Sequence, residues 1–282
     1  MPSTNPRPAG WEAEISLGFV RLEARTVLAG RRHRGPLRVQ KALYPEGPEV
    51  CQAILLHPPS GIAGGDRLTV GVHAGPGAHA QITTPGAGKW YRSAGDEAAQ
   101  TLDFSVADGA ALEWLPQESI VFDGARARME TRVTLAGEAR YLGWEILCLG
   151  RAASGERFAR GQLALSTRIE RDGRPLWIER GRLAGGDARL FSPAGWAGAS
   201  VGGTLLASLA PGDDAAARLE ACRAIRPPGG IEHALTALPG LIVARCLGTS
   251  GEAARRWFAD LWHCLRPALF GRPALDPRIW NT

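Results

Sequence analysis

Apolar and polar residues alternate in short runs along most of this chain, a pattern that is typical of β-strands. Within residues 14–19, Ile15, Leu17 and Phe19 alternate with polar or small neighbours, and residues 102–106 repeat this period of two. Gly-, Pro- and Asp-rich turns separate further runs of the same kind, which predict strands at residues 37–43, 50–56, 66–73, 78–84, 111–115, 119–122, 126–135, 141–149, 161–170, 176–180, 201–209 and 241–247.

The spacing of these runs favours an all-β protein built in layers. Strand signals recur about every eight to twelve residues and no helical period separates them, so βαβ units are excluded. Asp172-Gly173 lies between two alternating runs, and this dipeptide is a strong signal for a tight β-hairpin.

The last quarter of the chain predicts about two α-helices. Residues 213–224 have helical composition, with Asp213 or Asp214 placed as the N-cap. Thr249-Ser250-Gly251-Glu252 fits a capping box for a second helix, which Pro267 is expected to end. One face of that helix is apolar and predicts core packing: Ala254, Trp257, Phe258, Leu261, Trp262 and Leu265.

Composition indicates one folded domain over residues 1–282. Hydrophobic residues make up 45% and charged residues 22% of the chain, which is ordinary for a globular protein. We expect a disordered tail at residues 1–10, a β-rich body at 11–210 and a helix-containing part at 211–282 that packs on the same body. The apolar terminus, ending Pro277-Arg278-Ile279-Trp280, is expected to dock on it as well.

The net charge of +5 comes almost wholly from arginine, since Lys41 and Lys89 are the only lysines among 33 basic residues. The arginines are scattered, and the short run Arg31-Arg32-His33-Arg34 is interpreted as a loop tip. A nucleic-acid binder more often has a dense basic stripe with interleaved aromatics, so nucleic acid is not an expected partner. Arginines spread in this way suit contacts with acidic protein surfaces.

Five cysteines lie far apart in the sequence, without the CxxC spacing of a zinc site. They are expected to be reduced thiols, mostly buried, in a cytoplasmic protein. The N-terminus has no apolar signal core, and no run approaches the roughly 20 apolar residues of a membrane span, so a membrane location is not expected.

Two motifs that resemble enzyme signatures fail on context. Gly88-Lys89 is not a phosphate-binding loop, because Walker A requires Ser or Thr after the lysine and Trp90 stands there. Residues 198–202, GASVG, satisfy the nucleophile-elbow pattern around Ser200, yet a strand-like segment follows where that elbow needs a helix. A serine hydrolase that uses Ser200 is kept as the alternative function. The histidines do not cluster, and a tight structural metal site is not expected.

Several longer segments carry a family resemblance. They are HPPSGIAGGD (57–66), TTPGAGKWYRS (83–93), WLPQESIVFDGA (114–125), GWEILCLGR (143–151) and PRIW (277–280). In this order and spacing the chain resembles the urease accessory protein D family, called H in some bacteria, from about Gly18 to its end.

The resemblance implies a fold and a function. The family fold is mainly β, a two-layer, β-helix-like stack of many short strands with a couple of helices. The family acts in urease maturation without catalysis, as a scaffold and metallochaperone with accessory proteins F and G, of which G is the nickel-carrying GTPase. The resemblance implies docking on apo-urease for nickel insertion, as a dimer within the accessory complex. It implies no tightly bound cofactor, only Ni²⁺ in transit.

A metal that is passed along must be held weakly, because a closed His/Cys cage would retain Ni²⁺. Carboxylates along a polar passage are suitable ligands, and the candidates are Asp66, Glu118, Asp123, Glu145 and Glu179. Glu145 is the most telling, because it interrupts an apolar strand and a buried unpaired carboxylate costs several kcal/mol. The alternative for each is a salt bridge to arginine or an outward-facing position.

Overall fold

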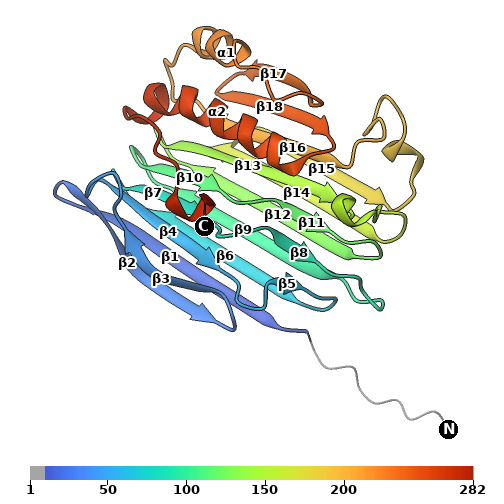
Figure 1. Ribbon diagram of the computed structural model, residues 1–282. Coiled ribbons are helices and arrows are strands. Elements are labelled where there is room, and N and C mark those ends of the chain that lie inside the picture. The colour runs from blue at the N-terminus through green and yellow to red at the C-terminus, as the bar shows by residue number, and fades with distance from the viewer. Residues whose placement is uncertain (1–9, 282) are drawn as a thin grey trace.

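The computed structural model describes residues 10–281, which form a β-solenoid of about four turns with two α-helices near the C-terminus (Figure 1). This confirms the mainly β, two-layer architecture. The tail expected at residues 1–10 lies outside the described residues, except for Gly10.

Two sheets form the layers. The first, sheet A, has the order β15 (Arg174–Ala184), β14 (Gln162–Arg171), β12 (Arg126–Leu135), β9 (Ala98–Val106), β6 (Arg67–Ala74), β1 (Glu12–Leu22) and β2 (Arg25–Arg34). The second, sheet B, has the order β17 (Glu232–Leu238), β18 (Leu241–Gly248), β16 (Val201–Ser208), β13 (Arg140–Leu149), β10 (Ala111–Leu115), β7 (His79–Thr83), β4 (Val50–Leu56) and β3 (Arg38–Leu43). Three short strands extend sheet B, namely β5 (Gly61–Ile62), β8 (Gly88–Trp90) and β11 (Ser119–Val121).

The chain coils by crossing between the two sheets. Each of the first three turns uses one strand of sheet B, one short strand and one strand of sheet A: β4-β5-β6, β7-β8-β9 and β10-β11-β12. Strands β13 and β14 make the fourth turn. Strands of successive turns therefore pair in parallel within each sheet, because the crossover that parallel pairing requires is supplied by the opposite sheet.

Equivalent tight turns stack on one another where the chain passes from sheet A to sheet B. The amides of Ala78, Ala110 and Ala139 each donate to the carbonyl three residues earlier, at 3.0, 3.0 and 2.9 Å. The three alanine side chains are buried beneath the stack. Gly77 and Gly109 have φ of 67° and 65°, a conformation that favours glycine, which explains why Gly-containing turns recur in the sequence.

Two apolar cores hold the layers together. The first lies between the inner faces of the sheets and is built from the alternating residues of strands such as β1 and β9. The second lies between the outer face of sheet B and the helices α1 (Ala215–Arg223) and α2 (Gly251–Phe270), and Figure 1 shows α2 packed over this sheet. The predicted apolar face of α2 is fully buried in this second core, as the sequence pattern predicts.

Most predicted strands are confirmed to within a few residues, but two edge strands were missed. Arg31–Arg34 is not a loop tip: it is the end of β2, whose last six residues are all exposed. β2 is an edge strand of sheet A, and β17, an edge strand of sheet B, was also missed. Exposed edge strands lack a buried face on which alternation depends, and charged residues at edges also discourage pairing with other chains.

The helix boundaries correct two expectations. Ser250, not Thr249, caps α2, because its side chain accepts a hydrogen bond from the Ala253 amide. Pro267 does not end α2, which continues to Phe270 and stops at Gly271 in the left-handed conformation. The last turn buries Leu269, so packing outweighs the hydrogen bond that proline cannot donate. Asp214 caps α1, one of the two predicted possibilities.

The C-terminal segment docks on the second core, as predicted. The Trp280 indole nitrogen donates to Thr83 Oγ1 at 2.8 Å, and its ring lies 6.0 Å from the rings of both Trp144 and Trp262. Within residues 10–281, neither α-helix combines the length and the apolar character that crossing a membrane requires.

Candidate functional site

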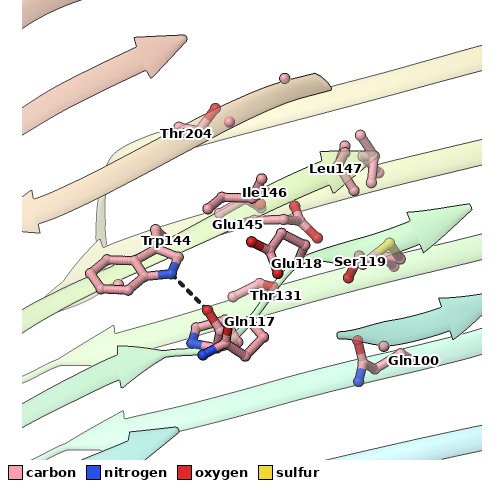
Figure 2. Close-up of a pocket in the computed structure, with 18 of the residues that line it drawn as sticks. Gln100, Gln117, Glu118, Ser119, Thr131, Trp144, Glu145, Ile146, Leu147 and Thr204 are labelled. Atoms are coloured by element: carbon pink, nitrogen blue, oxygen red, sulfur yellow. Dashed lines mark hydrogen bonds between the residues drawn. The ribbon is translucent and has the colours of Figure 1, made fainter. Parts of the chain in front are cut away.

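A cavity of about 950 Å³ lies between the sheets, with walls that continue into the segments 84–89 and 116–119 beside the short strands of sheet B (Figure 2). Most inward-facing positions of the solenoid are apolar. Around the cavity some become polar, and Figure 2 shows Gln100, Thr131, Glu145 and Thr204 among its lining residues. The wall of the cavity is therefore mainly apolar, with polar side chains at a few positions.

One polar row crosses the inner face of sheet B. Strand pairing places Glu145 on β13 opposite Thr204 on β16, and Thr204 opposite Arg245 on β18. All three residues line the cavity. The row arises because each side chain occupies a position of the inward-facing series in its strand.

A second polar row crosses the inner face of sheet A. Thr131 on β12 pairs with Thr167 on β14, which pairs with Glu179 on β15. The two rows meet where Arg245 Nη2 lies 2.5 Å from Glu179 Oε1. This ion pair joins the sheets across the cavity, so the salt bridge weighed as the alternative for Glu179 is present.

Glu145 has no such cationic partner among the described residues. Its carboxylate borders the cavity but is enclosed by protein, and this burial raises the pKa of Glu145 to about 7, with a further contribution from the Glu179 carboxylate. Near neutral pH the group therefore holds a proton part of the time. A cation entering the cavity would stabilise its charged form.

Glu118 approaches the same part of β13 from another direction. It precedes β11, whose first residue Ser119 pairs with Leu147, and it lines the cavity. Figure 2 shows its side chain near that of Glu145 in the view. Glu118 Oε1 also lies 3.6 Å from Arg255 Nε on α2, a long ion pair between half-buried groups. Three of the candidate carboxylates, at positions 118, 145 and 179, thus line one cavity.

Asp66 and Asp123 do not line this cavity. The Asp66 carboxylate accepts hydrogen bonds from the Trp11 and Ala63 amides, both at 2.8 Å, and so organises the turn before β6. Asp123 is buried in a turn, where Arg160 donates two hydrogen bonds to it. The side-chain hydrogen bond from Arg160 holds the pKa of Asp123 below its usual value despite the desolvation. Both carboxylates are therefore engaged in hydrogen bonds that hold nearby turns in place.

Sequence reasoning missed the neutral and cationic residues of the two polar rows, namely Thr131, Thr167, Thr204 and Arg245. A signal for them exists, because each interrupts an alternating series that is otherwise apolar. Met129 and Val133, for example, flank Thr131 in the inward series of β12 and belong to the core. A polar residue at such a position marks either a satisfied core group or a cavity.

The donor set suits a weakly held cation. Carboxylates and hydroxyls are hard ligands that exchange readily, whereas thiolate and imidazole cages retain Ni²⁺ more tightly. Within residues 10–281, no group of three His, Cys, Asp or Glu side chains is arranged to hold a metal. This part of the chain therefore contains no closed coordination site made from three such side chains.

The hydrolase alternative finds no assembled triad in the described part of the chain. Ser200 directly precedes β16, so a strand follows it and not a helix. His233 packs edge-on against Trp257, and His263 Nε2 lies 2.6 Å from Asp276 Oδ1, so neither ring is bonded to Ser200. Gly88 and Lys89 lie in the short strand β8, which is not the helix start that a phosphate-binding loop needs.

The fold and the site define a class of protein: a β-solenoid that encloses a cavity with carboxylate and arginine side chains on a mainly apolar wall. The family model described as "UreD urease accessory protein" matches residues 12–281. A protein of Dechloromonas aromatica (strain RCB), named urease accessory protein UreD, is 62% identical over 100% of this chain and 99% of its own. One from Azoarcus sp. (strain BH72), with the same name, is 57% identical over 97% and 95%. The chain belongs to the UreD urease accessory protein family, and its role is in urease maturation.

Proposed function

We propose that this chain is a non-catalytic scaffold and metallochaperone that helps to insert nickel into apo-urease. In this proposal it acts with accessory proteins F and G in the cytoplasm, as a dimer within the accessory complex. GTP is hydrolysed by the partner G, which agrees with the failed phosphate-binding motif around Lys89.

The single observation that carries the nickel role is the carboxylate-lined cavity inside a urease accessory protein. Glu145 borders it without a cationic partner in the described residues, beside the hydroxyl of Thr204. Ni²⁺ is the cargo. The hard oxygen ligands bind it weakly one after another, so that it is released and not retained.

The Glu179–Arg245 ion pair fits the same role. A mobile cation competes with the Arg245 guanidinium for the Glu179 carboxylate, so the pair allows Ni²⁺ to bind only transiently. Glu118 is placed beside the same part of β13 and provides a further carboxylate along the route. In this proposal Asp66 and Asp123 support the walls of the protein and do not touch nickel.

Co-expression provides the test. Apo-urease and accessory proteins F and G are produced with and without this chain, and the purified urease is measured for bound nickel and for urea hydrolysis. We expect both quantities to fall when the chain is absent. Full nickel content and full activity without the chain would reject the proposed role.

A further inference from the structure

A second hollow, of about 420 Å³, lies on the surface away from the carboxylate cavity, and three arginines surround it. Arg92 follows β8, Arg126 begins β12, and Arg160 lies in the turn before β14. We call this feature the arginine pocket. Among the described residues that line it, none is acidic.

Strand pairing brings the three arginines together. Arg92 forms an isolated antiparallel bridge with Ala125, the residue before Arg126. Arg126 in turn pairs with Gln162, two residues beyond Arg160. Gly124 has φ of 80°, and a Cβ there would lie 2.9 Å from Arg92 Cγ, so glycine leaves the space that the Arg92 side chain crosses.

The buried carboxylate of Asp123 holds two of the guanidinium groups from behind. Arg160 Nη2 lies 2.6 Å and Arg160 Nε 3.1 Å from Asp123 Oδ2. Arg92 Nε donates to the Asp123 carbonyl oxygen at 3.3 Å, and Arg92 Nη2 lies 3.8 Å from Asp123 Oδ2. Both side chains remain largely exposed towards the pocket, at 63% for Arg92 and 70% for Arg160. The guanidinium groups of Arg92 and Arg160 are therefore held in place, but these contacts use only some of their N–H donors.

Arg126 is exposed and has no hydrogen-bond or ion-pair partner among residues 10–281. Among the described residues, the Asp123 carboxylate thus contacts two of the three guanidinium groups around the hollow and leaves Arg126 uncompensated. Gathered like charges repel one another and lower stability unless an opposite charge approaches. The pocket has the charge and the donors to attract an oxyanion.

We propose that the arginine pocket binds carboxylate side chains of an acidic segment in a partner polypeptide. The planar fork of a guanidinium matches a carboxylate, with two parallel N–H···O bonds. Three such groups around one open hollow match a series of acidic side chains better than a single small anion.

The surroundings favour a polypeptide over a small free anion. Tyr91, next to Arg92, is 36% exposed and packs edge-on against Phe122 at 5.2 Å. The Arg151 guanidinium lies over the Phe122 ring, 4.5 Å from the ring centre. Exposed Tyr and Arg together are typical of protein interfaces. Exposed single ion pairs contribute little, so binding here requires the several contacts that an extended chain makes.

The test uses the full chain and a hexaglutamate peptide as the probe, with binding measured by calorimetry at low salt. We expect Arg126→Gln to weaken binding roughly fivefold or more, because a charge-assisted hydrogen bond is lost. Arg132→Gln is the matched control, since it removes the same charge from an exposed position on the same strand. It should change the affinity less than twofold or so.

Two results would overturn the proposal. Equal losses of peptide affinity in Arg126→Gln and Arg132→Gln would mean that binding depends only on the net charge of the surface. Inorganic phosphate that binds as tightly as the peptide, and is weakened equally by Arg126→Gln, would mean a small-anion site. Both arginines are exposed, so unchanged thermal unfolding of the two variants verifies that each remains folded.

Discussion

Arg266 Nε lies 2.9 Å from Glu113 Oε2, and both side chains are completely buried. The pair joins α2 to β10 across 153 residues of sequence. Arg266 also binds Glu46, with Nη2 2.9 Å from Oε1, while His79 Nε2 lies 2.7 Å from Glu113 Oε1. The charges of this network compensate one another, which is the condition for burying them.

Breaking this pair is expected to destabilise the fold. Arg266→Met leaves the Glu113 carboxylate buried with reduced compensation, at a cost of about 3–5 kcal/mol in the free energy of unfolding. Arg256→Met is the control, because Arg256 forms an exposed pair with Glu252 on the same helix. That change should cost less than about 0.5 kcal/mol. Urea denaturation measures both, and equal effects of the two substitutions would contradict the assignment.

The same network predicts loss of stability in acid. Burial alone would raise the pKa of Glu113, but His79 and Arg266 outweigh it and lower the pKa to about 2, from an ordinary 4.5. The unfolded chain therefore takes up the proton first, so this contribution is full above the ordinary pKa and is lost as the pH falls from 4.5 towards 2. Glu113→Gln removes the titrating group, and its unfolding free energy should depend less steeply on pH in that window. A slope equal to that of the unsubstituted chain would contradict this.

The fold was largely predictable because the inner strands of sheet A bury one face and expose the other. That burial imposes the period of two that the sequence displays in β9 and β12. β2 and β17 lie at sheet edges with little buried surface, and their patterns carry no such constraint. The stacking order of the parallel strands depends on contacts between distant segments, so alternation alone does not specify it.

The candidate site was predictable only in part, for a related reason. Glu145 could be recognised because a carboxylate in an apolar strand is expensive wherever the strand lies. Its neighbour Thr204 is 59 positions away and becomes a neighbour through the register of β13 and β16. Asp66 and Asp123 are also carboxylates, but backbone amides already bind them: Ala63 in the turn of Asp66, and Arg160 in the turn before β14 for Asp123. Residue type does not distinguish these two roles.

The proline inside α2 gives a prediction about stability. Pro267 is exposed and lies in the last turn, where it cannot donate the hydrogen bond that an amide would give to the helix. Pro267→Ala is expected to stabilise the chain by roughly 1–3 kcal/mol in thermal or urea unfolding. Ala268→Gly, at the neighbouring exposed position, is the control and should destabilise by about 0.5–1 kcal/mol. A destabilising Pro267→Ala would mean that the proline ring makes a contact worth more than the missing bond.

Ser200 separates the scaffold from the hydrolase alternative. Because Ser200 precedes a strand and binds no histidine in the described residues, Ser200→Ala should leave urease activation unchanged. The measurement is urea hydrolysis after co-expression with apo-urease and the accessory proteins. Complete loss of activation, in a variant that still folds and still enters the complex, would favour a catalytic serine.

Glu145 gives the sharpest prediction for the proposed nickel route. In Glu145→Ala the cavity keeps its walls but loses the carboxylate that lacks a cationic partner among the described residues. We expect the accessory complex to form as before, while the nickel content and activity of urease fall by roughly tenfold, the effect of about 1.4 kcal/mol. Glu170→Ala is the matched control, because Glu170 lies on sheet A, does not line the cavity and pairs with Arg168. It should leave nickel loading unchanged. Glu145→Gln keeps the shape of the side chain and removes its charge. A loss of nickel loading in both Glu145 variants therefore assigns the effect to the charge. Full nickel content in Glu145→Ala would reject a role for this residue in nickel transfer.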